Sequence, residues 1–213
     1  TVYRIRPQHG NEQVREVIPV DYAGVLVTDR FSSYEAAELR GVRQHKCLAH
    51  LLRNIREVLE SKNGSARTFG LQLKALLLEA HQLWGRQRAG PLEDYAARVQ
   101  EIEELLTYLL RPRRLRDADN QRLLDGIGWQ HDRGRVPRFL RNPAVEPTNN
   151  RAERALRPAV IARKVSHCSK NERGAEAFAA FTSVARTAVK QGEPSVTNAF
   201  LRLMQNASTA EPN

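Results

Sequence analysis

Asp29 stands where a carboxylate could hold a divalent cation. It follows the short apolar run Gly24–Thr28, which predicts a strand buried on both faces of a parallel sheet. Ligands of open α/β sheets sit at the carboxyl ends of the strands, and a carboxylate there suits Mg²⁺, which prefers oxygen ligands. The structural alternative is that Asp29 is a turn residue capping a helix that starts at Phe31. Position alone leaves both interpretations open.

Glu153 is the second candidate carboxylate, and it also has two interpretations. Asn150 followed three residues later by an acid is a capping box, which stabilises a helix by about 1 kcal/mol and needs no other role. Alternatively, Glu153 is a metal ligand on a rigid helix. Asn149, Glu153 and Arg157 are spaced four apart and share one helix face. Arg154 and Arg157 would then supply cations for phosphate beside the carboxylate.

Cys47 and His50 are two possible soft-metal ligands three residues apart. A structural zinc site needs four ligands, and the other cysteine and histidines match no common zinc motif. We therefore expect a packed cysteine and a hydrogen-bonded histidine near a sheet edge. The sequence also contains neither a G-x-x-x-x-G-K-[ST] loop nor a G-x-S-x-G elbow, which disfavours P-loop NTPases and α/β-hydrolases.

The elements that must position these residues change in character along the chain. Strands are expected at 1–6, 24–28 and 42–47, with short helices at 11–18 and 31–39 between them. From Ala49 the pattern turns helical, with three amphipathic runs between Leu51 and Leu109. A short helix is expected to end near Pro158, with Arg163 and Lys164 in a connection after it. Helices at 174–190 and 195–204 complete the chain.

This order predicts an α/β fold with a helical insertion. We expect a partial sheet over 1–50, a helical insertion over 51–128, a return segment with the Glu153 helix over 129–205, and a disordered tail over 206–213. The 213 residues are 41% hydrophobic, which is enough for one domain with an insertion. No apolar stretch approaches the ~18 residues of a membrane span, and the two cysteines favour a reducing cytoplasm.

The positive charge is concentrated in one part of the chain. The net charge is +10, yet residues 51–110 hold eight basic and eight acidic residues. Residues 133–173 hold eleven Arg or Lys against three Glu. Such a local excess favours a surface for a polyanion, the alternative being a solvated basic face.

Three motifs in this order resemble DDE-type transposases of the insertion sequence 66 family. They are Gly-Val-Leu-Val-Thr-Asp-Arg-Phe-Ser-Ser-Tyr from Gly24, Cys-Leu-Ala-His-Leu-Leu-Arg from Cys47, and Pro-Thr-Asn-Asn-Arg-Ala-Glu-Arg-Ala-Leu-Arg-Pro from Pro147, followed by Arg163-Lys164. The resemblance runs over roughly residues 2–203. The Asn-Asn-x-Ala-Glu-Arg-Ala-Leu-Arg string is its most specific part.

The resemblance implies an RNase H-like (ribonuclease H-like) core with a large helical insertion between the second Asp strand and the Glu helix. It implies that Asp29 and Glu153 are catalytic and bind Mg²⁺ or Mn²⁺. Cys47, His50, Asn149 and Asn150 would support the site. Basic residues would bind DNA phosphates, namely Arg151, Arg154, Arg157, Arg163 and Lys164.

The implied function is metal-dependent phosphodiester cleavage and strand transfer at transposon ends during DNA transposition and recombination. Transposon-end and target DNA would be the partners, with a homo-oligomer in a transpososome, no membrane, and a nucleoid-associated location in a bacterial cytoplasm. Family members carry a first catalytic Asp on a strand upstream of the one that matches 1–6. Nothing precedes Thr1 here, and Asp21 reads as a structural turn residue. We therefore expect a truncated core, inactive alone; the alternative is a non-catalytic DNA-binding remnant.

Overall fold

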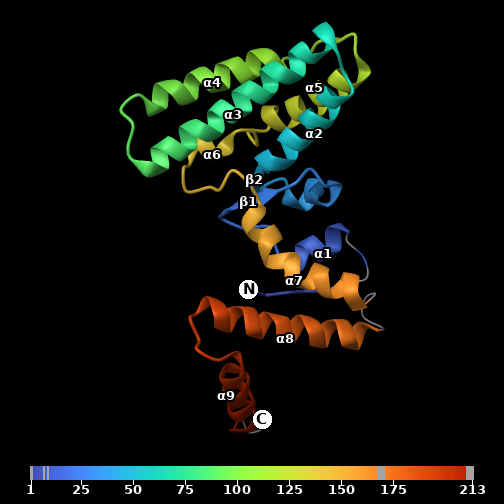
Figure 1. Ribbon diagram of the computed structural model, residues 1–213, viewed down its shortest axis with the longest axis vertical. Coiled ribbons are helices and arrows are strands. Elements are labelled where there is room, and N and C mark those ends of the chain that lie inside the picture. Colours follow the sequence, from blue (N-terminus) through green and yellow to red (C-terminus); the bar gives the residue numbers. More distant parts are fainter. Residues whose placement is uncertain (1, 7, 9, 167–170, 210–213) are drawn as a thin grey trace. The chain divides into compact units, whose positions relative to one another are not determined.

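A computed structural model describes residues 2–6, 8, 10–166 and 171–209. The chain divides into two compact units, which we treat separately. The sheet unit comprises Val14–Asn149, and the terminal unit comprises Thr1–Gln13 with Asn150–Asn213. In its described part the chain is mostly helical with a small parallel sheet, which is compatible with the expected α/β class (Figure 1).

Two parallel strands form the sheet. β1 (Val25–Thr28) pairs with β2 (Arg43–Lys46), and their register places Val25 opposite Arg43 and Thr28 opposite Lys46. Both strands lie where the sequence predicts them. The parallel pairing brings the carboxyl ends of both strands, and the residues that follow them, to one edge of the sheet.

The connection between the strands differs from the expected helix over 31–39. It consists of two 3-10 turns, η1 (Ser32–Glu35) and η2 (Ala37–Leu39). Ala36 separates them because its backbone is extended, with φ −53° and ψ 143°. Ala36 and Leu39 are buried against Val42, so packing of the apolar residues against the start of β2 replaces a regular helix.

A block of helices follows β2 and holds the main core of the sheet unit. It comprises α2 (Leu48–Glu60), η3 (Gly64–Arg67), α3 (Thr68–Ala89), α4 (Tyr95–Leu110), α5 (Ala118–Asp132) and α6 (Arg138–Arg141). Their apolar stripes meet in one cluster that includes Leu51, Leu73, Ile102 and Phe139. Figure 1 shows α3 and α4 running antiparallel beside each other. The predicted helical block is confirmed.

The first residues do not form the strand expected at 1–6. Val2–Arg6 have no strand pairing. Tyr3 is instead buried in the terminal unit, where its backbone N–H donates to Ser183 Oγ at 2.8 Å and its hydroxyl donates to the carbonyl of Ala155. These contacts replace a strand partner, so the alternation of apolar and polar residues does not produce a strand. The helix expected at 11–18 is shorter, α1 (Asn11–Arg15).

The terminal unit contains three longer helices, α7 (Asn150–Ser166), α8 (Glu172–Lys190) and α9 (Val196–Thr209), orange to red in Figure 1. α7 continues through Pro158, so Arg163 and Lys164 lie in its last turn and not in a connection. A proline removes only one backbone donor, and the remaining N–H groups can continue the helix. The disordered tail expected over 206–213 is wrong for 206–209, which belong to α9; residues 210–213 lie outside the described part, as does Cys168.

Among the residues that the structure describes, none of the helices has the length and apolar character needed to cross a bilayer.

Candidate active site

Asp29 follows β1 directly, at the carboxyl edge of the sheet. Its side chain is half-buried, and its Oδ1 accepts a hydrogen bond from the backbone N–H of Phe31 at 3.0 Å. This bond fixes the turn that leaves the strand, but it caps no helix, because η1 begins at Ser32 and has no side-chain cap. The edge position that the functional interpretation requires is present. The catalytic role of Asp29 stays a prediction.

A fully buried lysine lies at the same edge. Lys46, the last residue of β2, is opposite Thr28 in the sheet register and is 0% exposed. Its Nζ donates to Thr28 Oγ1 at 3.2 Å and to Gln44 Oε1 at 3.0 Å, and it forms an ion pair with Glu35 at 2.9 Å. A buried ammonium group needs such partners because the loss of water is otherwise uncompensated.

Glu35 is the carboxylate at the centre of this buried charge network. Besides Lys46, it binds the guanidinium of Arg135 at 2.5 Å and the side-chain amide of Gln130 at 3.0 Å. Burial alone would raise the pKa of Glu35, but the hydrogen bonds from Lys46, Arg135 and Gln130 outweigh it and lower that pKa to about 2. Glu35 is therefore ionised at neutral pH.

The charge of Asp29 acts on two neighbouring side chains, Lys46 and Tyr34. Burial lowers the pKa of Lys46, while the charges of Glu35 and, more weakly, Asp29 act in the opposite direction. Burial raises the pKa of the Tyr34 hydroxyl, and the charge of Asp29 raises it further. Asp29 thus lies close enough to the buried Lys46 for its charge to act on the lysine.

Sequence reasoning missed Lys46, Glu35 and Arg135. The available signal was a lysine near the end of the strand expected at 42–47, because a lysine that becomes buried in a sheet requires a carboxylate partner.

Cys47 connects the end of the sheet to the segment that leads into α7. Its backbone N–H donates to the carbonyl of Thr28 at 2.6 Å. Its thiol is 1% exposed and accepts a hydrogen bond from the backbone N–H of Asn149 at 3.4 Å. The next residue, Leu48, donates its N–H to the carbonyl of Pro147 at 2.8 Å. These contacts show a packed cysteine. The supporting roles of Cys47 and of His50, which lies in the first turn of α2, stay predictions.

His45 provides a second link that the sequence did not reveal. It is 1% exposed, and its Nδ1 and Nε2 lie 3.1 Å and 3.0 Å from the carbonyl oxygens of Arg135 and Pro147. Burial, the largest effect, lowers the pKa of His45 to about 4, and the charges of Arg138 and Lys46 act in the same direction. The neutral ring donates to one of the two carbonyls. His45 therefore ties the basic segment and the Pro147 segment to the sheet.

Glu153 lies on α7, in the terminal unit, and its side chain is exposed. Asp29 belongs to the sheet unit, so the convergence of these two carboxylates stays a prediction, as does the capping box between Asn150 and Glu153. α7 also carries the predicted DNA-binding residues, all exposed: Arg151, Arg154, Arg157, Arg163 and Lys164.

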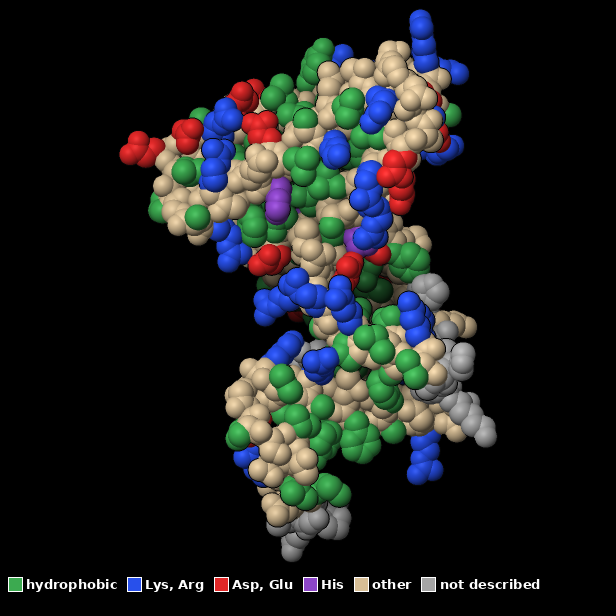
Figure 2. Space-filling view, in the orientation of Figure 1, with side chains coloured by type: hydrophobic (Ala, Val, Ile, Leu, Met, Phe, Trp, Pro, Cys, Tyr) green, Lys and Arg blue, Asp and Glu red, His purple; other side chains and the backbone are tan. Residues whose placement is uncertain are grey.

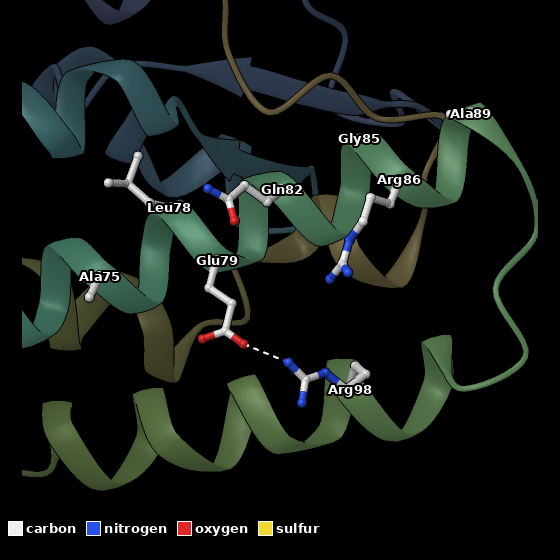
Figure 3. Close-up of a pocket in the computed structure, with 8 residues that line it drawn as sticks. All are labelled: Ala75, Leu78, Glu79, Gln82, Gly85, Arg86, Ala89 and Arg98. Carbon is white, nitrogen blue, oxygen red and sulfur yellow. Dashed lines mark hydrogen bonds and ion pairs between the residues drawn. The ribbon is translucent and has the colours of Figure 1, made fainter.

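Two clefts lie elsewhere in the sheet unit. The larger, about 770 Å³, lies on the face of α3 and α4, where Glu79 of α3 points to Arg98 of α4 at 2.9 Å (Figure 3). Its only acid is already paired, so it offers no set of metal ligands. The smaller, about 310 Å³, is lined by Arg30, the neighbour of Asp29, which donates to Asn54 at 2.7 Å. No cluster of three or more His, Cys, Asp or Glu suited to a metal occurs within the described ranges.

Comparisons with known proteins agree with the motifs at this edge. The model of a family described as "Transposase IS66 family" matches residues 1–177, a span that contains Asp29, Cys47 and Glu153. No curated protein and no solved structure matches the chain. Since the family match covers most of the 213 residues, this chain belongs to the IS66 family of transposases.

Proposed function

We propose that this chain is a catalytic core that cleaves and joins DNA at transposon ends. The observation that carries the proposal is the position of Asp29 at the carboxyl edge of a parallel sheet, in a chain of a transposase family. We further propose that β1 and β2 belong to an RNase H-like core, with residues 51–128 as its helical insertion and 129–205 as its return segment. The helices that follow β2 support this division.

Asp29 and Glu153 are the proposed metal ligands. Both supply the hard oxygen donors that Mg²⁺ and Mn²⁺ prefer, and the proposal requires both carboxylates to serve one metal centre. Such ions, when bound, activate water or a 3′-hydroxyl and stabilise the leaving oxygen of a phosphodiester. The chain's own contribution begins with the Phe31 N–H bond that orients Asp29 at the edge of the sheet.

The supporting residues act on the segment that carries Glu153. The Cys47 thiol binds the N–H of Asn149 immediately before α7, so it fixes where this helix starts. The exposed arginines of α7 are proposed to bind the phosphates of transposon-end DNA. Arg151, Arg154 and Arg157 are three residues apart and therefore follow one side of the helix. Such contacts make binding strongly dependent on salt.

The second candidate function is non-catalytic DNA binding by a transposase remnant. It needs only the basic residues of α7. The observation in its favour is the lack, within the described ranges, of a cluster of three potential metal ligands. Both candidates predict DNA affinity, so metal-dependent cleavage separates them.

The test measures nicking and strand transfer on a supercoiled plasmid that carries the transposon ends, with Mg²⁺ or Mn²⁺. Asp29→Asn and Glu153→Gln are compared with two matched controls, Asp21→Asn and Glu176→Gln, which remove an acid from the same two units. Catalysis predicts that the first two variants lose activity by about 10³-fold or more, while both controls keep it. Duplex binding should persist in all four variants.

Cleavage that survives Asp29→Asn or Glu153→Gln would refute the catalytic assignment. Salt-dependent duplex binding without any cleavage by the full-length protein would favour the remnant.

A further inference from the structure

A second basic surface lies on the sheet unit, between residues 108 and 133, before the start of α7. We name it the α4–α5 surface and define it by six exposed residues, Tyr108, Arg111, Arg114, Arg116, Trp129 and Arg133. They belong to the last turns of α4 and α5 and to the connection between these helices. Figure 2 shows Lys and Arg side chains projecting from the end of the sheet unit where this connection lies.

The last turns of α4 and α5 lie against each other. The Thr107 hydroxyl and the His131 Nε2 are 2.8 Å apart. The Leu110 carbonyl would lie 3.2 Å from a Cβ atom at Gly128, so the two backbones approach closely there. The aromatic residues of both helices therefore belong to neighbouring turns of one surface.

Each of these turns carries an arginine stacked on an exposed ring. The Arg111 guanidinium carbon lies 3.8 Å from the centre of the Tyr108 ring, and that of Arg133 lies 3.6 Å from the Trp129 ring. Tyr108 is 66% exposed and Trp129 is 41% exposed, so neither ring is part of the helical core. A guanidinium on a ring forms a flat cationic platform.

The arginines of this surface lack carboxylate partners. Within the described ranges, Arg111, Arg114, Arg116 and Arg133 form no ion pair. Three neighbouring acids pair with other cations: Lys62 binds Asp117 at 2.7 Å and Asp119 at 2.6 Å, and Arg141 binds Glu103 at 2.7 Å. The exposed Asp132 precedes Arg133 but forms no ion pair with it within the described ranges. The four guanidinium groups are therefore not held by direct ion pairs.

Helix capping accounts for only part of this arrangement. Arg111 donates to the carbonyl of Tyr108 at 2.6 Å, and Arg133 donates to that of Trp129 at 3.1 Å, as cations near helix C-termini do. Capping does not explain Arg114 and Arg116, which have no hydrogen bond within the described ranges, or the exposure of the two rings.

We propose that the α4–α5 surface binds single-stranded DNA. Arginines that are not held by direct ion pairs attract phosphates, and exposed rings and guanidinium planes stack on unpaired bases, which a closed duplex does not offer. Arg114 and Arg116 contact phosphates, while Tyr108 and Trp129, with their stacked arginines, receive bases. The surface shares no residue with the proposed catalytic site, so this proposal does not depend on the catalytic assignment.

The test is fluorescence anisotropy with a labelled single-stranded oligonucleotide of mixed sequence and its duplex, over a range of salt concentrations. Arg114→Ala/Arg116→Ala is compared with Lys74→Ala/Arg86→Ala, a pair on α3 that removes the same charge from the same unit. The first pair should weaken single-strand binding by about tenfold and reduce the salt slope by about 1.4, at roughly 0.7 per phosphate contact. The control pair should change neither quantity appreciably.

The stacking part is tested with Tyr108→Leu and Trp129→Leu. Each should weaken single-strand binding by at least about fivefold with an unchanged salt slope, because stacking involves no counterion release. Tyr108 is the more exposed of the two, so its variant keeps the test valid if Trp129→Leu unfolds. The proposal is overturned if these variants bind like the unmodified chain, if the control pair weakens binding equally, or if duplex binding falls as much as single-strand binding.

Discussion

Removal of the buried lysine is the sharpest test of the network beneath Asp29. In Lys46→Met the side chain keeps a similar length but loses its charge, so Glu35 retains only Arg135 and Gln130 as partners. The pKa of Glu35 falls from 4.5 to about 2 in the fold. Each pKa unit corresponds to about 1.4 kcal/mol, so its partners together favour the carboxylate by about 3 kcal/mol. Lys46 is the first of the three hydrogen-bond donors in effect.

We therefore expect Lys46→Met to lower the free energy of unfolding by about 2 kcal/mol at pH 7, because a buried carboxylate loses one of its two cations. Glu35→Gln should also destabilise. The loss of unfolding free energy in the double variant should be smaller than the sum of the two single losses by about 1.5 kcal/mol, since the partner of each removed charge is removed as well.

The measurement is urea unfolding followed by tryptophan fluorescence. Both tryptophans, Trp84 and Trp129, belong to the sheet unit, so the signal reports the unit that contains the network. The linkage also predicts a pH window. Since folding lowers the pKa of Glu35, the ionised Glu35 stabilises the fold fully above pH 4.5, and this contribution is lost as the pH falls through 4.5 toward 2. Glu35→Gln should abolish this loss.

Additivity of the two substitutions within about 0.3 kcal/mol would refute the coupling between Lys46 and Glu35.

Three further outcomes follow from single contacts. Folding lowers the pKa of His45 from 6.5 to about 4. The free energy of unfolding should therefore fall by up to about 3 kcal/mol as the pH drops from 6.5 to 4. Urea midpoints of His45→Gln should lack this pH dependence. Gly70→Ala should lower the free energy of unfolding by about 1–2 kcal/mol in thermal or urea experiments, since the new Cβ would lie 2.9 Å from Leu59 Cδ2. Gly85→Ala, in the same helix, should be neutral or stabilising because no atom lies within 4 Å of the new Cβ. Equal effects of the two substitutions would contradict this packing. Cys47→Ala should lower unfolding stability by about 1–2 kcal/mol, since the buried N–H before α7 loses its acceptor, whereas Cys47→Ser should recover part of it.

The sequence was most informative where the signal was local. The strands expected at 24–28 and 42–47 became β1 and β2. The amphipathic runs after Ala49 became a packed helical block, because side-chain periodicity decides which face of a helix is buried. Predictions failed where a distant contact decided the outcome. Residues 1–6 alternate like a strand, but the Tyr3 N–H bonds to Ser183, which lies 180 residues away.

The residues of the candidate site also fall into those predicted from local sequence and those found only in the structure. The sequence by itself determined the family, the acid that follows the first strand, and the basic character of the Glu153 helix, because these depend on motif order and composition. It did not determine the burial of that strand, since Val25, Leu26 and Val27 are only half-buried. Only the tertiary structure revealed that Lys46 is buried and that Glu35 joins it to Arg135, 100 residues further along the chain. A buried charge is stable only with a partner, and the partner is chosen by the packing of distant segments.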